Sequence, residues 1–116
     1  MTKVLVTDDS AFMRKVLVDI LNKNGYTETI EAQDGKEAIE KFNSEKPDLV
    51  LLDVIMPEMD GLEVLKQIVP LGAKAIVISA VGQETMMTQA KDFGAKGYII
   101  KPFDESKVLE EIKKVL

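Results

Sequence analysis

The sequence of 116 residues contains no cysteine and no histidine. Without cysteine the chain can form no disulfide and no thiolate metal site, which suits the cytosol. Without histidine it has no imidazole general base, no histidine metal ligand and no phosphohistidine. Oxygen atoms are therefore the side-chain ligands that this chain can offer to a metal ion.

Basic surface and long apolar runs are also missing. The formal net charge of −5 argues against a broad surface for nucleic acid or for an anionic membrane, because either needs a basic patch. No apolar run approaches the length of a membrane span, and a predicted strand starts at Lys3, so we expect no signal peptide. We therefore expect a cytoplasmic protein.

The composition that remains is that of a soluble globular domain. Hydrophobic residues make up 46% of the chain and charged residues 30%, a balance that distinguishes it from disordered chains. The length suits one hydrophobic core, and there is no internal repeat, low-complexity tract or linker. We expect residues 1–116 to form one domain.

Short apolar runs alternate with segments of helical periodicity along the whole chain. Strands are expected at 3–7, 27–32, 49–52, 75–79 and 97–101. Helices are expected at 11–23, after Asp34-Gly35, from Asp60 to about residue 70, at 83–93 and at 104–116. This alternation predicts a parallel sheet covered by helices on both faces. Residues 49–52 are unbroken aliphatic, as in a central strand, whereas Glu28 and Glu31 indicate an edge strand.

Two adjacent carboxylates, Asp8 and Asp9, end the first apolar run. One interpretation is a helix N-cap, because the side chain of Asp9 or Ser10 could accept from free amides of the following helix. That interpretation does not explain why two acids that repel each other stand beside a strand that enters the core.

Three more polar residues close their strands at the same edge of the predicted sheet. Asp53 ends the third strand, Ser79 the fourth and Lys101 the fifth. Ligands of such sheets bind beyond the carboxyl ends of the strands. The common edge therefore favours a site that includes Asp8 and Asp9, although one acid can still cap the helix.

The charges of this cluster indicate a divalent cation. Three carboxylates contribute −3 and Lys101 contributes +1, so a divalent cation brings the local sum to zero. Oxygen ligands suit Mg²⁺, and Mn²⁺ can substitute. Asp53 is framed by apolar residues and is the candidate nucleophile for a phosphoryl group. The metal and Lys101 would neutralise charge on the transferring oxygens, and the Ser79 hydroxyl could bond to one of them.

The segments "TDDS", "LLDVIMPEMDG", "ISA" and "GYIIKPF" resemble the receiver domain of response regulators, specifically the free-standing CheY type. The resemblance covers the whole chain, and the combined motifs are far more specific than any one of them. It implies a doubly wound, flavodoxin-like fold with five strands in the order 2-1-3-4-5. It also implies a phosphorylation-dependent switch of a two-component system.

The resemblance assigns a role to each residue of the cluster. Asp53 matches the phosphoacceptor, which becomes 4-aspartylphosphate. Asp8, Asp9 and Asp53 match the Mg²⁺ ligands, Asp8 largely through water, and the backbone carbonyl of Ile55 matches a further ligand.

Three more positions match family residues that contact the phosphoryl group or respond to it. Ser79 and Lys101 match the residues that contact it, and Tyr98 matches an aromatic switch. A cis peptide bond between Lys101 and Pro102 is also implied. Ser79 could instead be an ordinary loop residue, and Tyr98 a plain core aromatic.

The partners implied are a histidine kinase of the CheA type, a flagellar or archaellar motor component or adaptor, and a phosphatase. The chain would be a monomer that catalyses only its own phosphotransfer and dephosphorylation, rather than an enzyme. Met87 and Lys91, with Tyr98, form a candidate partner surface; Met87 could equally be a stray exposed methionine. A phosphorelay intermediate that passes its phosphoryl group to a histidine domain is the alternative function.

Two rivals come from other classes of protein. An Mg²⁺-dependent aspartyl phosphatase of the haloacid-dehalogenase type has a second aspartate two residues after the nucleophile, where this chain has Ile55. A flavodoxin-type electron carrier needs a Ser/Thr/Gly-rich phosphate loop after the first strand. The loop here is acidic and would repel phosphate in the absence of a metal ion.

Overall fold

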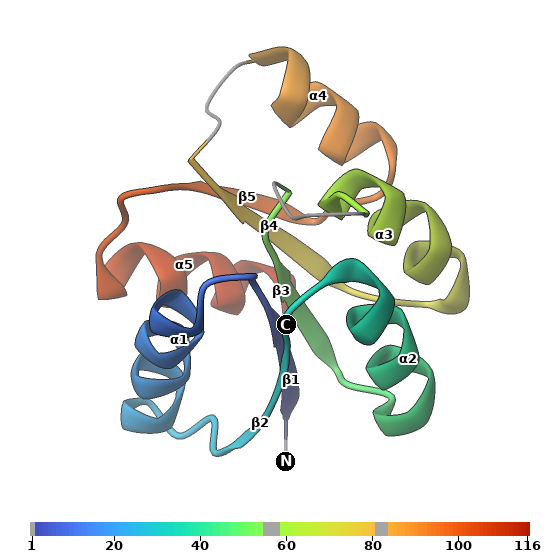
Figure 1. The fold of residues 1–116 in the computed structure, drawn as a ribbon. Coiled ribbons are helices and arrows are strands. Elements are labelled where there is room, and N and C mark those ends of the chain that lie inside the picture. The colour runs from blue at the N-terminus through green and yellow to red at the C-terminus, as the bar shows by residue number, and fades with distance from the viewer. Residues whose placement is uncertain (1, 55–58, 81–83) are drawn as a thin grey trace.

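The computed structural model describes residues 2–54, 59–80 and 84–116. Within these ranges, strands and helices alternate as expected (Figure 1). The strands are β1 (Lys3–Thr7), β2 (Glu28–Ala32), β3 (Leu49–Leu52), β4 (Ala75–Ser79) and β5 (Gly97–Ile100). The helices are α1 (Ala11–Lys23), α2 (Gly35–Glu45), α3 (Gly61–Ile68), α4 (Glu84–Asp92) and α5 (Glu105–Val115), with a 3₁₀ turn η1 (Val69–Leu71) after α3.

The described strands form one parallel sheet in the order β2-β1-β3-β4-β5, which confirms the fold class and the strand order. Helices α1 and α5 cover one face of the sheet, and α2, α3 and α4 cover the other (Figure 1). The core is accordingly divided by the sheet into two apolar layers. One layer includes Leu17 and Ile112, and the other includes Phe42 and Leu65.

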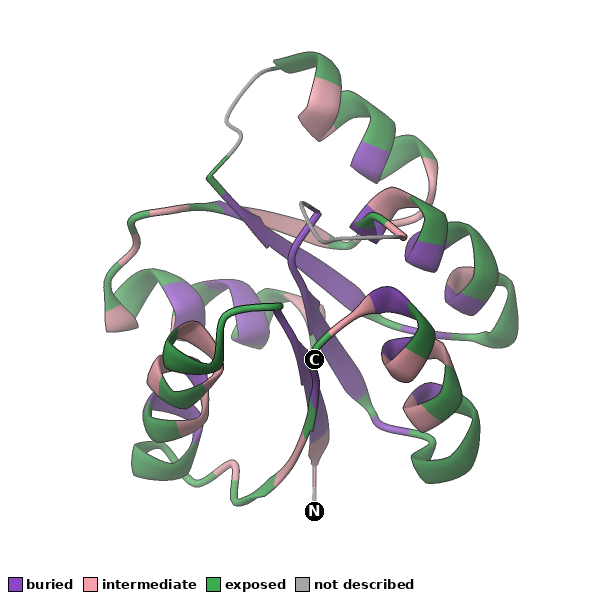
Figure 2. Cartoon of the chain, viewed as in Figure 1, coloured by how far each residue is buried: buried purple, intermediate pink, exposed green. Residues whose placement is uncertain are grey.

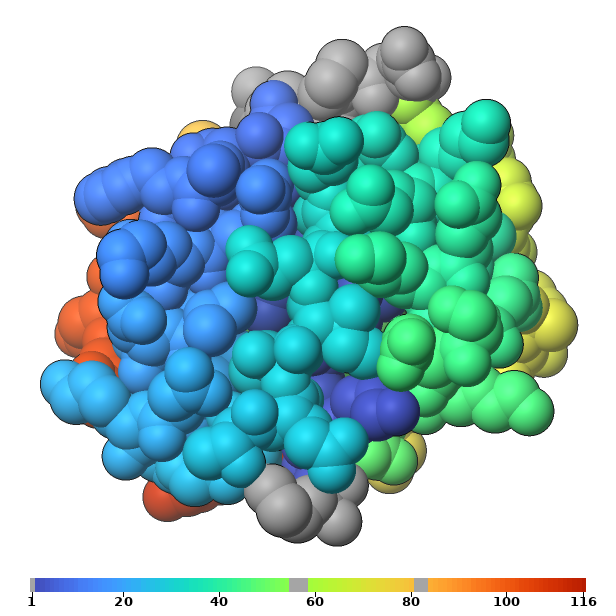
Figure 3. Space-filling view, turned by 60° about the horizontal axis from the view of Figure 1, so that its bottom comes forward, coloured from blue at the N-terminus to red at the C-terminus, as the bar shows by residue number. Residues whose placement is uncertain are grey.

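The burial of each strand follows its place in the sheet (Figure 2). Every residue of β3 and β4 is buried, because helices cover both faces of these inner strands. Strand β2 is an edge strand on which Glu28 and Glu31 are exposed, as their charge predicts. In the space-filling view, the cyan residues of this edge lie between α1 and α2 (Figure 3).

Most element boundaries agree with the sequence-based expectation to within one residue. Strands β1, β3 and β4 and helix α1 coincide with it. Strand β5 ends at Ile100 rather than Lys101, and α5 begins after Asp104, whose side chain caps the helix by accepting from the Lys107 amide. The predicted start of the fourth helix at Gln83 lies outside the described residues. No helix in the described ranges is long and apolar enough to cross a membrane.

Candidate functional site

Strand register brings the polar strand ends together. Thr7 of β1 pairs with Leu52 of β3, so Asp8 and Asp53 leave neighbouring strands at the same level. The Asp53 amide donates to the Thr7 carbonyl at 3.0 Å. On the other side of β4, the Lys101 amide donates to the Ser79 carbonyl at 2.8 Å. Backbone pairing therefore fixes where these side chains begin.

Three carboxylates meet at this edge. One carboxylate oxygen each of Asp8, Asp9 and Asp53 lies within 4.8 Å of the other two. Asp8 is 2% and Asp53 7% exposed, whereas Asp9 is exposed to solvent. The set consists of oxygen donors only and carries excess negative charge, which fits a hard divalent cation such as Mg²⁺.

Lys101 contacts two of these carboxylates. Its Nζ lies 2.9 Å from Asp8 Oδ2 and 3.3 Å from Asp53 Oδ2. Partial burial by itself lowers the pKa of Lys101, but its hydrogen bond to Asp8 and the charges of both carboxylates outweigh burial and raise that pKa. The side chain is therefore a cation at neutral pH and partly neutralises the cluster.

The N-cap of α1 is Ser10, so capping this helix does not explain the pair of acids Asp8 and Asp9. The Ser10 Oγ accepts from the Met13 amide at 3.2 Å. Asp8 instead accepts from the Ser10 amide through Oδ1 at 2.9 Å, and its Oδ2 faces Lys101. Since Ser10 caps α1, neither Asp8 nor Asp9 is needed for that purpose.

Ser79 and Tyr98 connect this edge to the outer part of the sheet. Ser79 is fully buried at the end of β4, and its side chain is hydrogen-bonded to that of Tyr98 on β5. Burial raises the pKa of Tyr98, the hydrogen bond to Ser79 lowers it, and the charge of Asp53 raises it further, so the net direction is upward. The tyrosine hydroxyl therefore lies within the electrostatic reach of Asp53.

The candidate partner surface is brought together beside α4 and β5. Met87, Lys91 and Tyr98 all line a cavity of about 390 Å³. Other lining residues are Glu84, Thr88, Ala90, Ala95, Lys96 and Gly97. Met87 is half-buried and Lys91 is exposed. Sequence reasoning therefore grouped three residues that share one hollow of the surface.

Two further expectations concern the backbone. The peptide bond between Lys101 and Pro102 is cis, as the family resemblance implies. The proposed metal ligand Ile55 lies outside the described residues.

Two residues that shape the site were missed by the sequence reasoning. A Cβ on Gly61 would lie 2.4 Å from the Asp53 carbonyl oxygen, so only glycine lets α3 start so close to the backbone of Asp53. Arg14 Nη1 donates to the Asp8 carbonyl at 2.7 Å. Gly61 had a signal in the motif "DVIMPEMDG", and Arg14 in being the only arginine of the chain.

Comparison with known families defines the class. The model of the response regulator receiver domain matches residues 4–113, and the chain therefore belongs to the response regulator receiver family.

Within this family, the chain is similar to chemotaxis proteins. The chain is 48% identical over 115 residues to "Chemotaxis protein CheY" of Thermotoga maritima, which covers 97% of this chain and 96% of that protein. It is 47% identical over 116 residues to "Chemotaxis protein CheY" of Bacillus subtilis, covering 98% and 97%.

Solved structures give the same assignment. The CheX-CheY-BeF3-Mg²⁺ complex from Borrelia burgdorferi matches with a TM-score of 0.95 and 38% identity, covering 98% of this chain and 88% of that chain. Chemotaxis protein CheY4 of Vibrio cholerae matches with a TM-score of 0.93 and 31% identity, covering 100% and 99%. The chain is thus a signalling protein that is similar throughout to CheY proteins.

Proposed function

We propose that this chain is a phosphorylation-dependent switch of chemotaxis signalling. Residues 1–116 form one receiver domain that takes a phosphoryl group on Asp53 from a histidine kinase of the CheA type. The observation that carries the proposal is the cluster of Asp8, Asp9 and Asp53 with Lys101 at the carboxyl edge of the sheet.

The chemical step is a phosphoryl transfer between two nucleophiles. A carboxylate oxygen of Asp53 forms a bond to phosphorus while the bond from phosphorus to the kinase's imidazole nitrogen breaks, and the electron pair leaves with that nitrogen. Lys101 Nζ, already 3.3 Å from Asp53 Oδ2, offsets negative charge on the phosphoryl oxygens.

The site would hold Mg²⁺ through Asp8, Asp9, Asp53 and the backbone carbonyl of Ile55. Bound Mg²⁺ supplies charge neutralisation for the phosphoryl oxygens. Asp8 is held by the Ser10 amide and by Lys101, so its carboxylate has a fixed direction, whereas Asp9 stands at the exposed mouth of the site. The same groups would support loss of the phosphoryl group to water, so that the only turnover is of the chain's own aspartyl phosphate.

Ser79 and Tyr98 would couple phosphorylation of Asp53 to the surface beside α4 and β5. A hydroxyl can donate one hydrogen bond and accept two, so Ser79 can contact a phosphoryl oxygen on Asp53 and Tyr98 together. Such a contact favours one arrangement of Tyr98, which lines the hollow with Met87 and Lys91. The hollow is the proposed surface for the downstream partner, a flagellar or archaellar motor component or its adaptor.

The chain would act in the cytoplasm as a monomer, with a phosphatase that shortens the signal. A phosphorelay intermediate is the second candidate, and one relative, 37% identical, is named "Sporulation initiation phosphotransferase F" of Bacillus subtilis. Chemotaxis is favoured because the relatives at 44–48% identity are named chemotaxis proteins.

The test is phosphorylation with a small donor. Acetyl phosphate with Mg²⁺ should add one hydroxylamine-labile phosphoryl group, seen by intact-protein mass spectrometry, and Asp53→Asn should abolish it. Asp48→Asn, an exposed aspartate remote from the cluster, is the matched control and should be labelled like the parent. Labelling that persists in Asp53→Asn would show that the nucleophile is another residue.

Capture of partner proteins distinguishes the chemotaxis assignment from the phosphorelay. The protein with and without beryllofluoride, which stands in for the phosphoryl group, is used to capture partners from the host. Capture of a motor or adaptor protein only with beryllofluoride supports the chemotaxis assignment, whereas capture of a histidine phosphotransfer domain supports the phosphorelay.

A further inference from the structure

Arg14 stands out among the basic residues of the chain. The sequence has 15 lysines and arginines, and Arg14 is the only arginine. It lies in the first turns of α1, and its side chain is only 15% exposed. An arginine differs from a lysine in presenting several donors in a rigid planar fork, which can hold two acceptors at once.

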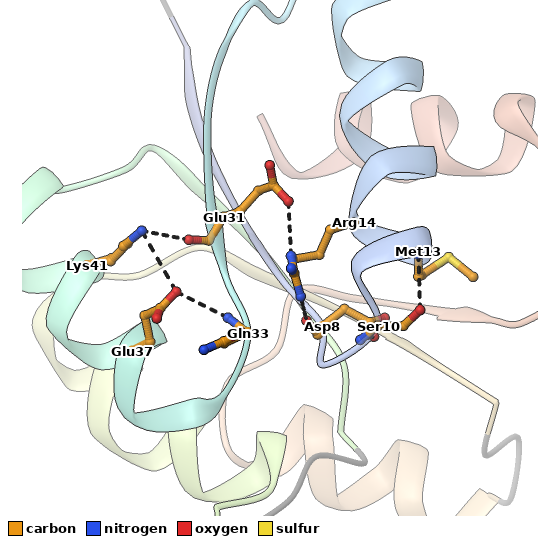
Figure 4. A network of polar contacts seen from close by, with 8 residues as sticks. All are labelled: Asp8, Ser10, Met13, Arg14, Glu31, Gln33, Glu37 and Lys41. Carbon is orange, nitrogen blue, oxygen red and sulfur yellow. Dashed lines mark hydrogen bonds and ion pairs between the residues drawn. The ribbon is translucent and has the colours of Figure 1, made fainter.

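The fork of Arg14 holds two acceptors from different elements (Figure 4). Nη1 donates to the backbone carbonyl of Asp8 at 2.7 Å, and Nε donates to Glu31 Oε1 at 2.9 Å. The guanidinium therefore ties the loop between β1 and α1 to the edge strand β2. The Coulomb attraction to Glu31 is modest because the Glu31 side chain is 50% exposed and water screens exposed ion pairs, so the geometry of the contact is its principal feature.

Glu31 is itself held in place. Its backbone carbonyl accepts from Lys41 Nζ at 2.9 Å, and Lys41 also lies 3.8 Å from the Glu37 carboxylate on the same helix, α2 (Figure 4). Glu31 pairs in the sheet with Val6 of β1. Arg14 is consequently anchored to a strand that has a fixed register with the strand leading to Asp8.

The carbonyl that Arg14 holds belongs to the peptide group between Asp8 and Asp9. A peptide group is planar, so fixing the direction of its oxygen fixes the plane from which both residues continue. The Asp8 carboxylate is held at two points, by the Ser10 amide on Oδ1 and by Lys101 on Oδ2, and the Asp8 amide donates to the Ala32 carbonyl at 3.2 Å. The contact from Arg14 is made to the carbonyl of the peptide that leads into the exposed Asp9, so it also constrains the backbone of Asp9.

We propose that Arg14 is a positioning residue of the metal site, which it preorganises through the peptide between Asp8 and Asp9. The inference rests on the proposed function, since it presumes that the acidic cluster binds Mg²⁺. Arg14 acts through the backbone and not as a ligand. Its positive charge alone would weaken binding of a cation, so the charge and the geometry of Arg14 predict opposite effects of substitution.

The experiment measures the Kd for Mg²⁺ of the unphosphorylated protein by isothermal titration calorimetry. Arg14→Lys keeps the charge and loses the fork, and Arg14→Met loses both. We expect both to bind Mg²⁺ about tenfold more weakly, the lower end of the effect of groups that orient metal ligands. Lys15→Met, on the same helix with the same loss of charge, should bind like the parent.

A second pair of variants avoids substituting Arg14. Glu31→Ala removes its anchor and should weaken Mg²⁺ binding by a smaller factor than Arg14→Met. Glu28→Ala removes the same charge from the same edge strand and should have no effect. The melting temperature of each metal-free variant is measured in parallel, because a purely structural role lowers that temperature without changing the Kd for Mg²⁺.

Three results would overturn the inference. If Arg14→Lys binds Mg²⁺ like the parent, the planar fork is not needed for the site, and if Arg14→Met binds Mg²⁺ more tightly, Arg14 acts through its charge. If only the melting temperature changes, Arg14 has a structural role only. If the parent itself binds no Mg²⁺, the proposed metal site is wrong and the inference falls with it, an outcome that the parent titration separates from the other two.

Discussion

Lys101→Met should destabilise the metal-free protein. The substitution keeps most of the side chain's length and removes the ammonium that lies 2.9 Å from Asp8 Oδ2 and 3.3 Å from Asp53 Oδ2. At an effective dielectric constant of about 20, each pair contributes roughly 5–6 kcal/mol of attraction before desolvation is counted. The loss leaves two buried carboxylates, 2% and 7% exposed, facing each other without their counter-ion.

The net effect is smaller than the Coulomb sum. Removing one partner of a buried ion pair costs about 3–5 kcal/mol, and the Lys101 side chain is 18% exposed, which places the expected loss near the lower limit. We expect a loss of about 3 kcal/mol in the free energy of unfolding, or roughly 10–15 °C in melting temperature for a domain of this size.

Urea denaturation at pH 7 without divalent cations measures this loss, with the exposed Lys74→Met as control. When the denaturation is repeated with Mg²⁺, the free energy of unfolding should rise more for Lys101→Met than for the parent. In the variant the metal ion replaces the missing positive charge, whereas in the parent the ammonium of Lys101 repels it. An unchanged free energy of unfolding in Lys101→Met would refute the reasoning, since it would mean that the carboxylates do not depend on Lys101 for neutralisation.

Four further predictions concern the same region. Asp9→Ala should raise the melting temperature of the metal-free protein, because it relieves carboxylate repulsion, and should abolish the stabilisation by millimolar Mg²⁺ that we expect of the parent; both are read by thermal denaturation. Ser79→Ala should still accept a phosphoryl group at Asp53 by mass spectrometry yet lose most phosphorylation-dependent binding of the captured partner, since one charge-assisted hydrogen bond of about 1.5–3 kcal/mol is removed. Thr7→Val should stabilise the protein by about 1 kcal/mol in urea denaturation, because the buried Thr7 Oγ1 finds no hydrogen-bond partner among the described residues; destabilisation would indicate a partner. The pKa of Lys101 is raised by its carboxylate partners in the folded state. The stability that Lys101 contributes is therefore complete below the ordinary pKa of 10.5 and is lost as pH rises through the higher pKa of the folded state. Over that alkaline range the free energy of unfolding of Lys101→Met should fall less than that of the parent in urea denaturation.

The sequence by itself determined the alternation of elements and the edge at which the site lies. Apolar runs and helical periodicity are local signals, and they placed β1, β3, β4 and α1 at the residues where they are found. The parallel sheet then required that Asp8, Asp53 and Lys101 meet at one edge, because the carboxyl ends of its strands lie together. The strand order came from the family resemblance and not from these patterns.

The tertiary structure alone decided which atoms of that edge touch. Ser10 rather than Asp9 caps α1, Arg14 holds the Asp8 carbonyl, and Gly61 permits the close approach of α3 to Asp53. The contacts of Arg14 and Gly61 join segments whose separation depends on strand register and on how the helices pack against the sheet, whereas the Ser10 cap is local and the sequence left it open between Ser10 and Asp9. Composition and periodicity carry no information on such distances, because they describe one element at a time, whereas a hydrogen bond of 2.7 Å between a helix and a loop is a property of the assembled fold.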